Sequence, residues 1–282
     1  MSDPAENGNL PKAILYSWPT SVWSTVPQLC LYEKGYSSDE YIIKLVDIST
    51  IPTLVVPTLE TTGNDVDTRY RSLRDTIPAP TLAPATIEAL AVRDEAELKA
   101  KAVRPPGKSL DYRRQALQSY LGEAKQAVAD SAVAPKEGSL TWEQKTVKFL
   151  EEKLKSNEQI WELYNGQASQ DKKEQFFEVC RKTWTESLPD AFSRLESLFK
   201  GPFALGDQVS LADLHAISWL TRLVSIAGGS PNASGIDSLT PHLGGYKFGP
   251  KVRDFWNEWV QRESFQQVLV PVCDDFEKMS GK

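Results

Sequence analysis

The chain has 282 residues, of which 40% are hydrophobic and 25% are charged, as in an ordinary globular protein. This length exceeds what one hydrophobic core usually organises, so we expect two domains. The formal net charge is −6 and the basic residues are scattered, which argues against nucleic acid as a partner. No apolar run approaches the roughly 20 residues needed to cross a bilayer, so we expect no membrane span.

The amino terminus and the cysteines bear on location. Residues 1–10 are polar and acidic, unlike a secretory signal, and we expect them to form a flexible tail. The three cysteines, Cys30, Cys180 and Cys273, are odd in number and far apart, which fits reduced thiols better than disulfides. We therefore expect a cytoplasmic protein. With only two histidines, a His-based metal site is not expected, and we predict no metal cofactor.

The first part of the chain shows a strand–helix–strand pattern. Residues 13–17 and 41–48 are short apolar runs of β-favouring residues. The segment between them has apolar residues at helical spacing and ends at Gly35, which predicts a short helix. Because proline is disfavoured inside a helix, Pro27 predicts that this helix begins late, near Ser24.

Strand signals continue until the composition changes. Residues 53–56 and 66–72 predict two further strands. Residues 77–90 and 102–108 are rich in proline, which predicts linkers. Beyond these segments the apolar residues follow a helical spacing to the end of the chain. We therefore predict a first domain over 11–83 and a second over 84–282.

Two helices of the second domain can be placed from local signals. Thr141 and Gln144 form a capping box that opens a helix, whose buried stripe should comprise Val147, Leu150 and Leu154. The second stretch, residues 175–200, places aromatic and aliphatic residues on one face. This spacing predicts core rather than a ligand site. Within that stretch, a kink or break is expected at a proline, Pro189.

The most specific local motif is GDQVSLADLHAISWL, residues 206–220. Ser210 is placed to cap a helix with Asp213 returning the bond, and Val209 can pack on Leu214. This run resembles the start of the core helix in the C-terminal domain of glutathione transferases. In that family the motif serves folding, so the resemblance implies that Ser210 and Asp213 stabilise the fold.

The segment YSWPTSVWSTVPQLCLYEKGY, which begins at Tyr16, resembles the strand-to-helix turn of the same family. That turn holds the residue that activates the glutathione thiol, and the resemblance puts Ser21 at this position, with Ser24 and Ser17 as competing candidates. A serine hydroxyl at a helix start can donate to a thiolate while the helix dipole favours the negative charge. The other interpretation is that Ser21 only caps the helix.

Two further segments are similar to the glutathione site of the family. Ile51 and Pro52 resemble the cis-proline turn, whose backbone pairs with the cysteinyl part of glutathione; Pro57 is the alternative. Asp75 and Thr76 resemble the acid–hydroxyl pair that binds the γ-glutamyl end. Together with Ser21, these four residues make up the glutathione site that the resemblance implies.

The sequence departs from the family at two connections. Only residues 49–51 separate the second strand from Pro52, too few for the helix that normally lies there. Prolines at 78, 80 and 84 follow Thr76, where another helix should open. Either both helices are lost, or residues near 49–51 and 76–79 are missing from this sequence, and we favour the second explanation.

The resemblance, to a fungal-type glutathione transferase, implies an α/β thioredoxin-like N-terminal domain followed by an all-α helical-bundle domain. It implies a detoxification enzyme and homodimer that uses glutathione as co-substrate against a hydrophobic electrophilic small molecule. The pocket for that molecule would be lined by aromatic residues such as Tyr112, Tyr120 or Trp219. The alternative is a catalytically silent glutathione- or ligand-binding or regulatory protein with the same fold.

Overall fold

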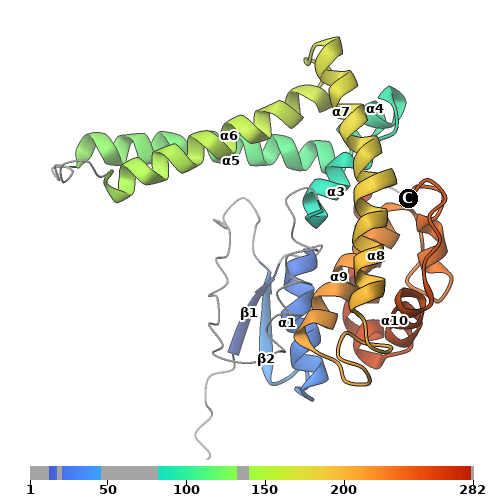
Figure 1. The fold of residues 1–282 in the computed structure, drawn as a ribbon. Coiled ribbons are helices and arrows are strands. Elements are labelled where there is room, and N and C mark those ends of the chain that lie inside the picture. Colours follow the sequence, from blue (N-terminus) through green and yellow to red (C-terminus); the bar gives the residue numbers. More distant parts are fainter. Residues whose placement is uncertain (1–12, 18–20, 46–81, 132–139, 281–282) are drawn as a thin grey trace, which may run out of the picture.

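A computed structural model of the chain describes residues 13–17, 21–45, 82–131 and 140–280. The expected tail at 1–10 and the strands expected over 53–56 and 66–72 lie outside the described residues. The full sequence has no further residues near 49–51 or 76–79, so the expectation that segments are missing there is wrong. The described part of the chain is mostly helical (Figure 1).

The predicted strand–helix–strand unit is confirmed. Strand β1 (Ala13–Ser17) pairs in parallel with β2 (Tyr41–Leu45), with Ala13 opposite Tyr41 and Ser17 opposite Leu45. Parallel strands need a crossover connection, and helix α1 (Val22–Glu33) provides it. This two-stranded sheet is the described part of the predicted N-terminal domain, whose thioredoxin-like topology and boundary at residue 83 stay predictions.

Helix α1 contradicts the late start predicted from its proline. It begins at Val22, with Ser21 as N-cap, and Pro27 lies inside it. A proline at this position removes one helical hydrogen bond, but burial of Val26 and Leu29 beside it favours the helix. Tertiary packing therefore outweighs the local preference at this proline.

The predicted stop of α1 at Gly35 is confirmed. Gly35 has φ +80°, a left-handed conformation that suits glycine. Its N–H donates to the carbonyl of Tyr32 over 2.9 Å, and the N–H of Tyr36 donates to the carbonyl of Leu31 over 3.1 Å. This pair of bonds is a Schellman motif, which satisfies the last carbonyls of the helix.

Three helices occupy the region where the prolines predicted linkers: α3 (Pro84–Leu90), α4 (Glu95–Ala102) and α5 (Pro105–Asp130). The prediction of linkers over 77–90 and 102–108 is therefore wrong for the described residues that these helices include. Pro84 and Pro105 each stand at a helix start, where the missing N–H needs no partner and the fixed φ suits the first turn.

Helices α5 and α6 (Trp142–Tyr164) form an antiparallel arm that extends from the helical body (Figure 1). The predicted capping box is confirmed, with Thr141 and Gln144 exchanging hydrogen bonds of 3.0 and 3.3 Å. The predicted buried stripe of Val147, Leu150 and Leu154 is only half-buried. The reason is that α6 has one long helical neighbour here, α5, which covers one side of the stripe.

The stretch predicted over 175–200 contains α7 (Gln170–Lys182), a π-helical segment η1 (Thr183–Ser187) and α8 (Leu188–Leu198). The predicted break at Pro189 is wrong, because the chain stays helical from α7 through α8. The α-helical pattern changes instead to a π-helical turn that ends at Ser187, two residues before this proline, and a kink stays a prediction. The apolar face is core, as predicted, and its buried residues are Phe176, Cys180, Trp184, Leu188, Phe192, Leu195 and Phe199.

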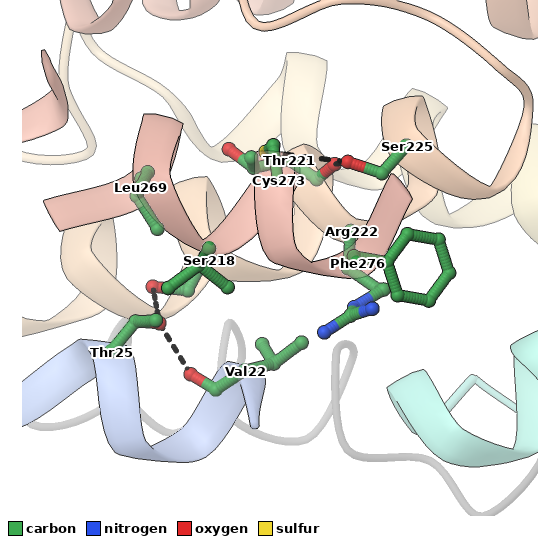
Figure 2. Close-up of a pocket in the computed structure, with 10 residues that line it drawn as sticks. Val22, Thr25, Ser218, Thr221, Arg222, Ser225, Leu269, Cys273 and Phe276 are labelled. Carbon is green, nitrogen blue, oxygen red and sulfur yellow. Dashed lines mark hydrogen bonds between the residues drawn. The ribbon is translucent and has the colours of Figure 1, made fainter. Parts of the chain in front are cut away.

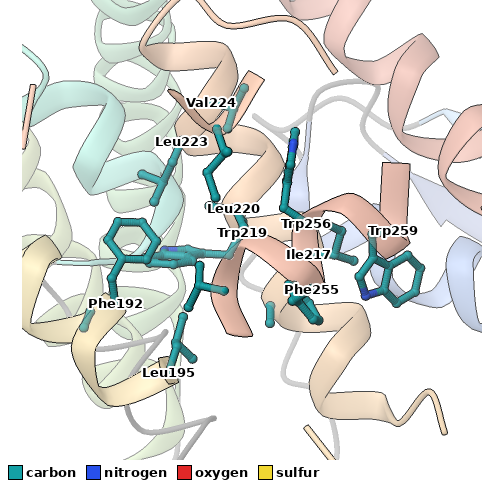
Figure 3. Close-up of a cluster of buried hydrophobic side chains, with 14 of the residues drawn as sticks. Phe192, Leu195, Ile217, Trp219, Leu220, Leu223, Val224, Phe255, Trp256 and Trp259 are labelled. Atoms are coloured by element: carbon teal, nitrogen blue, oxygen red, sulfur yellow. The ribbon is translucent and has the colours of Figure 1, made fainter. Parts of the chain in front are cut away.

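The central element of the core is α9 (Leu211–Ile226), which is buried along almost its whole length. The remaining elements are a 3₁₀ helix η2 (Gly235–Leu239), α10 (Pro250–Val260), a π-helical segment η3 (Phe265–Leu269) and α11 (Val270–Ser280). Figure 3 shows Trp219 of α9 beside Phe192 of α8, with ring centroids 5.4 Å apart. None of the described helices has the length and apolar character to span a bilayer.

The capping box at the start of α9 is confirmed and extends beyond the helix. The carboxylate of Asp213, which is fully buried, accepts from the N–H and hydroxyl of Ser210 over 2.8 and 2.6 Å. Its other oxygen accepts from the N–H of Ala204 over 2.7 Å. Burial raises the pKa of Asp213, and these hydrogen bonds oppose that rise. The carboxylate thus ties the preceding loop to α9.

We predict that Asp213→Ala lowers the free energy of unfolding by about 2–4 kcal/mol, because the buried N–H of Ala204 loses its acceptor and a charge-assisted network is removed. Urea denaturation followed by circular dichroism measures the loss. Asp207→Ala, at an exposed carboxylate of the same loop, is the control and should stay within about 0.5 kcal/mol of wild type. Equal stability of Asp213→Ala and wild type would contradict this role.

Candidate functional site

Ser21 lies where the sequence placed it, at the start of α1. It is the N-cap residue, with an extended backbone, and its side chain makes no capping hydrogen bond to the first turn. Because β1 ends at Ser17, the helix start follows the carboxyl end of a parallel strand, an edge where α/β proteins bind ligands. The first turn of a helix has free N–H groups and a partial positive charge, so this position suits an anion.

The two competing serines are engaged elsewhere. The hydroxyl of Ser24 donates to the carbonyl of Ser21 over 2.9 Å, inside the first turn. Ser17 is only 3% exposed, and its hydroxyl accepts from the Gln28 amide over 3.3 Å. Of these three serines, Ser21 therefore stands at the helix start with a side chain that makes no capping hydrogen bond. This is the position that the resemblance assigns to the residue that activates the thiol.

The other four predicted site residues, Ile51, Pro52, Asp75 and Thr76, lie outside the described residues. Their grouping with Ser21 stays a prediction.

A buried polar contact fixes α1 against α9 (Figure 2). The hydroxyl of Thr25 lies 3.0 Å from that of Ser218 and 2.6 Å from the carbonyl of Val22, so it joins the two helices. Beside it, α1, α9 and α11 enclose a cavity of about 10 Å³, lined partly by Arg222 and Cys273. A space of this size holds at most a single water, so it is no substrate pocket.

The other end of α1 is held by an ion pair. Arg262, just beyond α10, donates two hydrogen bonds to the carboxylate of Glu33, of 3.1 and 2.6 Å. The hydroxyl of Ser264 donates to the same carboxylate. Burial raises the pKa of Glu33, but the hydrogen bonds from Arg262 and Ser264 and the charge of Arg262 lower it further, so the net pKa lies below the usual range.

A lowered pKa stabilises the fold above the ordinary carboxyl pKa, and this stabilisation is lost as pH falls through the folded-state value. We predict that Glu33→Gln costs about 1–2 kcal/mol at pH 7 and that this difference from wild type shrinks below about pH 4. Denaturant unfolding at several pH values measures it, with Glu258→Gln, at an exposed residue of α10, as control. A difference that stays constant with pH would contradict the assignment.

Two aromatic residues that the sequence interpretation missed lie near the start of α1. The ring centroids of Trp23, in the first turn, and His215 of α9 are 5.8 Å apart. Trp23 is 43% exposed, whereas burial lowers the pKa of His215 and favours its neutral form. This pair forms an aromatic surface within one helical turn of Ser21. Only the position of Trp23, two residues after Ser21 in the sequence, could have indicated it.

The aromatic residues expected to line a second-substrate pocket have different locations. Trp219 is 1% exposed, and its indole N–H donates to the carbonyl of Leu82 over 3.0 Å. It belongs to the core, so that expectation is wrong for Trp219. Tyr112 and Tyr120 lie on α5, in the arm, and their proximity to a second substrate stays a prediction.

The cysteines and the other possible metal ligands were the remaining candidates for reactive or metal-binding groups. Cys30, Cys180 and Cys273 are all free thiols, which confirms that prediction. Across the described ranges, no group of three or more His, Cys, Asp or Glu side chains is arranged to hold a metal ion.

Residues 158–247 match the family model of the glutathione S-transferase C-terminal domain. The matched part runs from the base of α6 beyond η2 and includes α9 with its capping box. This finding supports the glutathione S-transferase family for the helical part of the chain. Neither a curated protein nor a solved structure matches the chain significantly.

Proposed function

We propose that this chain is a glutathione transferase-like enzyme that activates the glutathione thiol for attack on an electrophilic small molecule. The proposal proceeds from the match of its helical part to the C-terminal domain of that family. The observation that carries it further is Ser21 at the start of α1, with a side chain not engaged in capping.

In this proposal the hydroxyl of Ser21 donates a hydrogen bond to the glutathione sulfur. The partial positive charge at the helix start adds to this stabilisation, so the thiol loses its proton to solvent near neutral pH. The thiolate then forms a carbon–sulfur bond to the electrophilic carbon of a hydrophobic second substrate. Where that carbon bears a leaving group, the group departs with the bonding electrons.

The remaining predicted residues would hold the peptide. The backbone around Ile51 and Pro52 would pair with the cysteinyl part, and Asp75 with Thr76 would bind the γ-glutamyl end. We further propose that residues 11–83 form a thioredoxin-like domain and 84–282 the helical domain of a cytoplasmic homodimer that serves detoxification and uses no metal.

A second candidate, a catalytically silent glutathione-binding or regulatory protein, is favoured by the short connections. Only residues 46–51 separate the end of β2 from Pro52, and prolines at 78, 80 and 84 follow Thr76. These two connections are too short, or too rich in proline, for helices of normal length. The loss of both helices would weaken binding of glutathione.

We predict that Ser21→Ala lowers the rate of glutathione conjugation by about 10- to 100-fold while glutathione binding changes little, because the lost hydrogen bond acts mainly on the thiolate. Calorimetric titration with glutathione and a conjugation assay with a chlorinated nitroaromatic substrate measure the two effects. Ser24→Ala is the matched control, since its hydroxyl bonds within the helix, and should keep most of the activity.

Binding of glutathione by the wild type without conjugation would favour the silent candidate. No binding of glutathione would contradict both candidates. Equal conjugation rates for Ser21→Ala and wild type would remove Ser21 from the mechanism.

A further inference from the structure

Helix α9 carries a stripe of hydroxyl groups, although most of its neighbours in the core are apolar. Ser218, Thr221 and Ser225 are spaced by three and four residues, which places them on one side of the helix. This side faces α1 and α11, whose Thr25 and Cys273 it contacts. All three hydroxyl side chains are almost fully buried, so each needs a hydrogen-bond partner inside the protein.

The three hydroxyls of this stripe differ in their partners. That of Ser218 lies 3.0 Å from the hydroxyl of Thr25. That of Ser225 donates to the carbonyl of Thr221 over 3.0 Å. The hydroxyl of Thr221 itself is buried and has no hydrogen-bond partner within the part of the chain that the structure describes. Burial of a hydroxyl costs free energy unless a hydrogen bond offsets it, so a bound polar molecule would stabilise this group.

Thr221 lines the cavity of about 10 Å³ between α1, α9 and α11 (Figure 2). Thr25, Ser218, Arg222 and Ser225 line the same cavity, so polar groups from two helices border it. Its volume is about the least that holds one water, and a buried water usually has two to four polar partners. The cavity therefore has both the size and the polar lining of a water site.

The protons of the neighbouring hydroxyls define how a water fits. A hydroxyl has one proton to donate and lone pairs with which to accept. The hydroxyl of Thr25 donates to the carbonyl of Val22 over 2.6 Å, so it accepts from Ser218. The oxygen of Ser218 therefore keeps a lone pair with which to accept, and Thr221 keeps a proton to donate.

From the unpartnered hydroxyl of Thr221 and this lining we infer that the cavity is a binding site for one ordered water molecule. The water accepts from Thr221, donates to Ser218 and fills the space between α1, α9 and α11. The guanidinium of Arg222 disfavours a cation there, and a larger molecule does not fit. The inference goes beyond the proposed function and does not depend on it, since such a water stabilises the packing of α1 whether or not glutathione binds.

Thr221→Val tests the site, because it removes the hydroxyl and keeps the shape and volume of the side chain. We expect the number of long-lived waters, measured by oxygen-17 magnetic relaxation dispersion, to fall by about one. We also expect the equilibrium constant of unfolding, measured with urea, to rise about fivefold or more, because the hydrogen bond between the water and this side chain is lost.

Two further variants serve as controls. Thr185→Val makes the same substitution at a hydroxyl that donates to the carbonyl of Arg181, one helical turn earlier, over 2.9 Å. It should keep the water and stay within about threefold of wild type in the equilibrium constant of unfolding. Thr221→Ser keeps the hydroxyl in the cavity and should keep the water as well.

Loss of one long-lived water together with the loss of stability in Thr221→Val supports the site. An unchanged number of long-lived waters in this variant overturns it. A Thr221→Val variant that is as stable as wild type, or more stable, also overturns it, since removal of a hydroxyl that has no partner is close to neutral or stabilising.

Discussion

Helix α1 packs against the buried helix α9, and the orientation of Ser21 and Trp23 at the start of α1 depends on that contact. Val26 and Leu29 join the same apolar cluster as Trp219, while Thr25 makes a buried hydrogen-bonding contact with Ser218. The ion pair of Glu33 with Arg262 fixes the far end of the helix. A rotation of α1 would break all of these interactions at once, so the helix start is held in one orientation.

This rigidity matters for the chemistry proposed at Ser21. A hydrogen-bond donor stabilises a developing or buried charge best when it is already oriented, because no reorganisation is then needed. Helix α9 is itself fixed by Asp213, whose carboxylate joins Ser210 to the loop at Ala204. The capping box lies within the residues that match the family model, and it acts on the candidate site only through α9. It stabilises the helix on which α1 rests and need not touch a substrate.

Local signals in the sequence predicted the elements whose cause is local. The capping boxes at Thr141 and Ser210 and the glycine stop at Gly35 involve residues within a few positions of one another. By contrast, Pro27 lies inside α1 because packing of the helix outweighs one lost hydrogen bond. The half-buried seam of α6 likewise depends on how many helices surround it, which periodicity alone does not reveal.

The candidate site shows the same difference between local and long-range causes. The position of Ser21 followed from a motif contiguous with a strand and a helix start. The approach of His215 to Trp23 joins segments that are far apart in the sequence. Trp219 is buried by packing in the main core cluster, where its indole also donates to the carbonyl of Leu82. Neither contact has a local signature. The sequence identified residue types suited to thiolate chemistry, while their surroundings depend on long-range packing.

The ionisation of glutathione bound to the protein tests the central claim most directly. Ultraviolet absorbance of the thiolate, recorded across pH, gives the pKa of the bound thiol. The account predicts a bound thiol that ionises near neutral pH, well below free glutathione, and a return toward the free value in Ser21→Ala. A bound thiol with the pKa of free glutathione, or a lowered pKa that persists unchanged in Ser21→Ala, would contradict it.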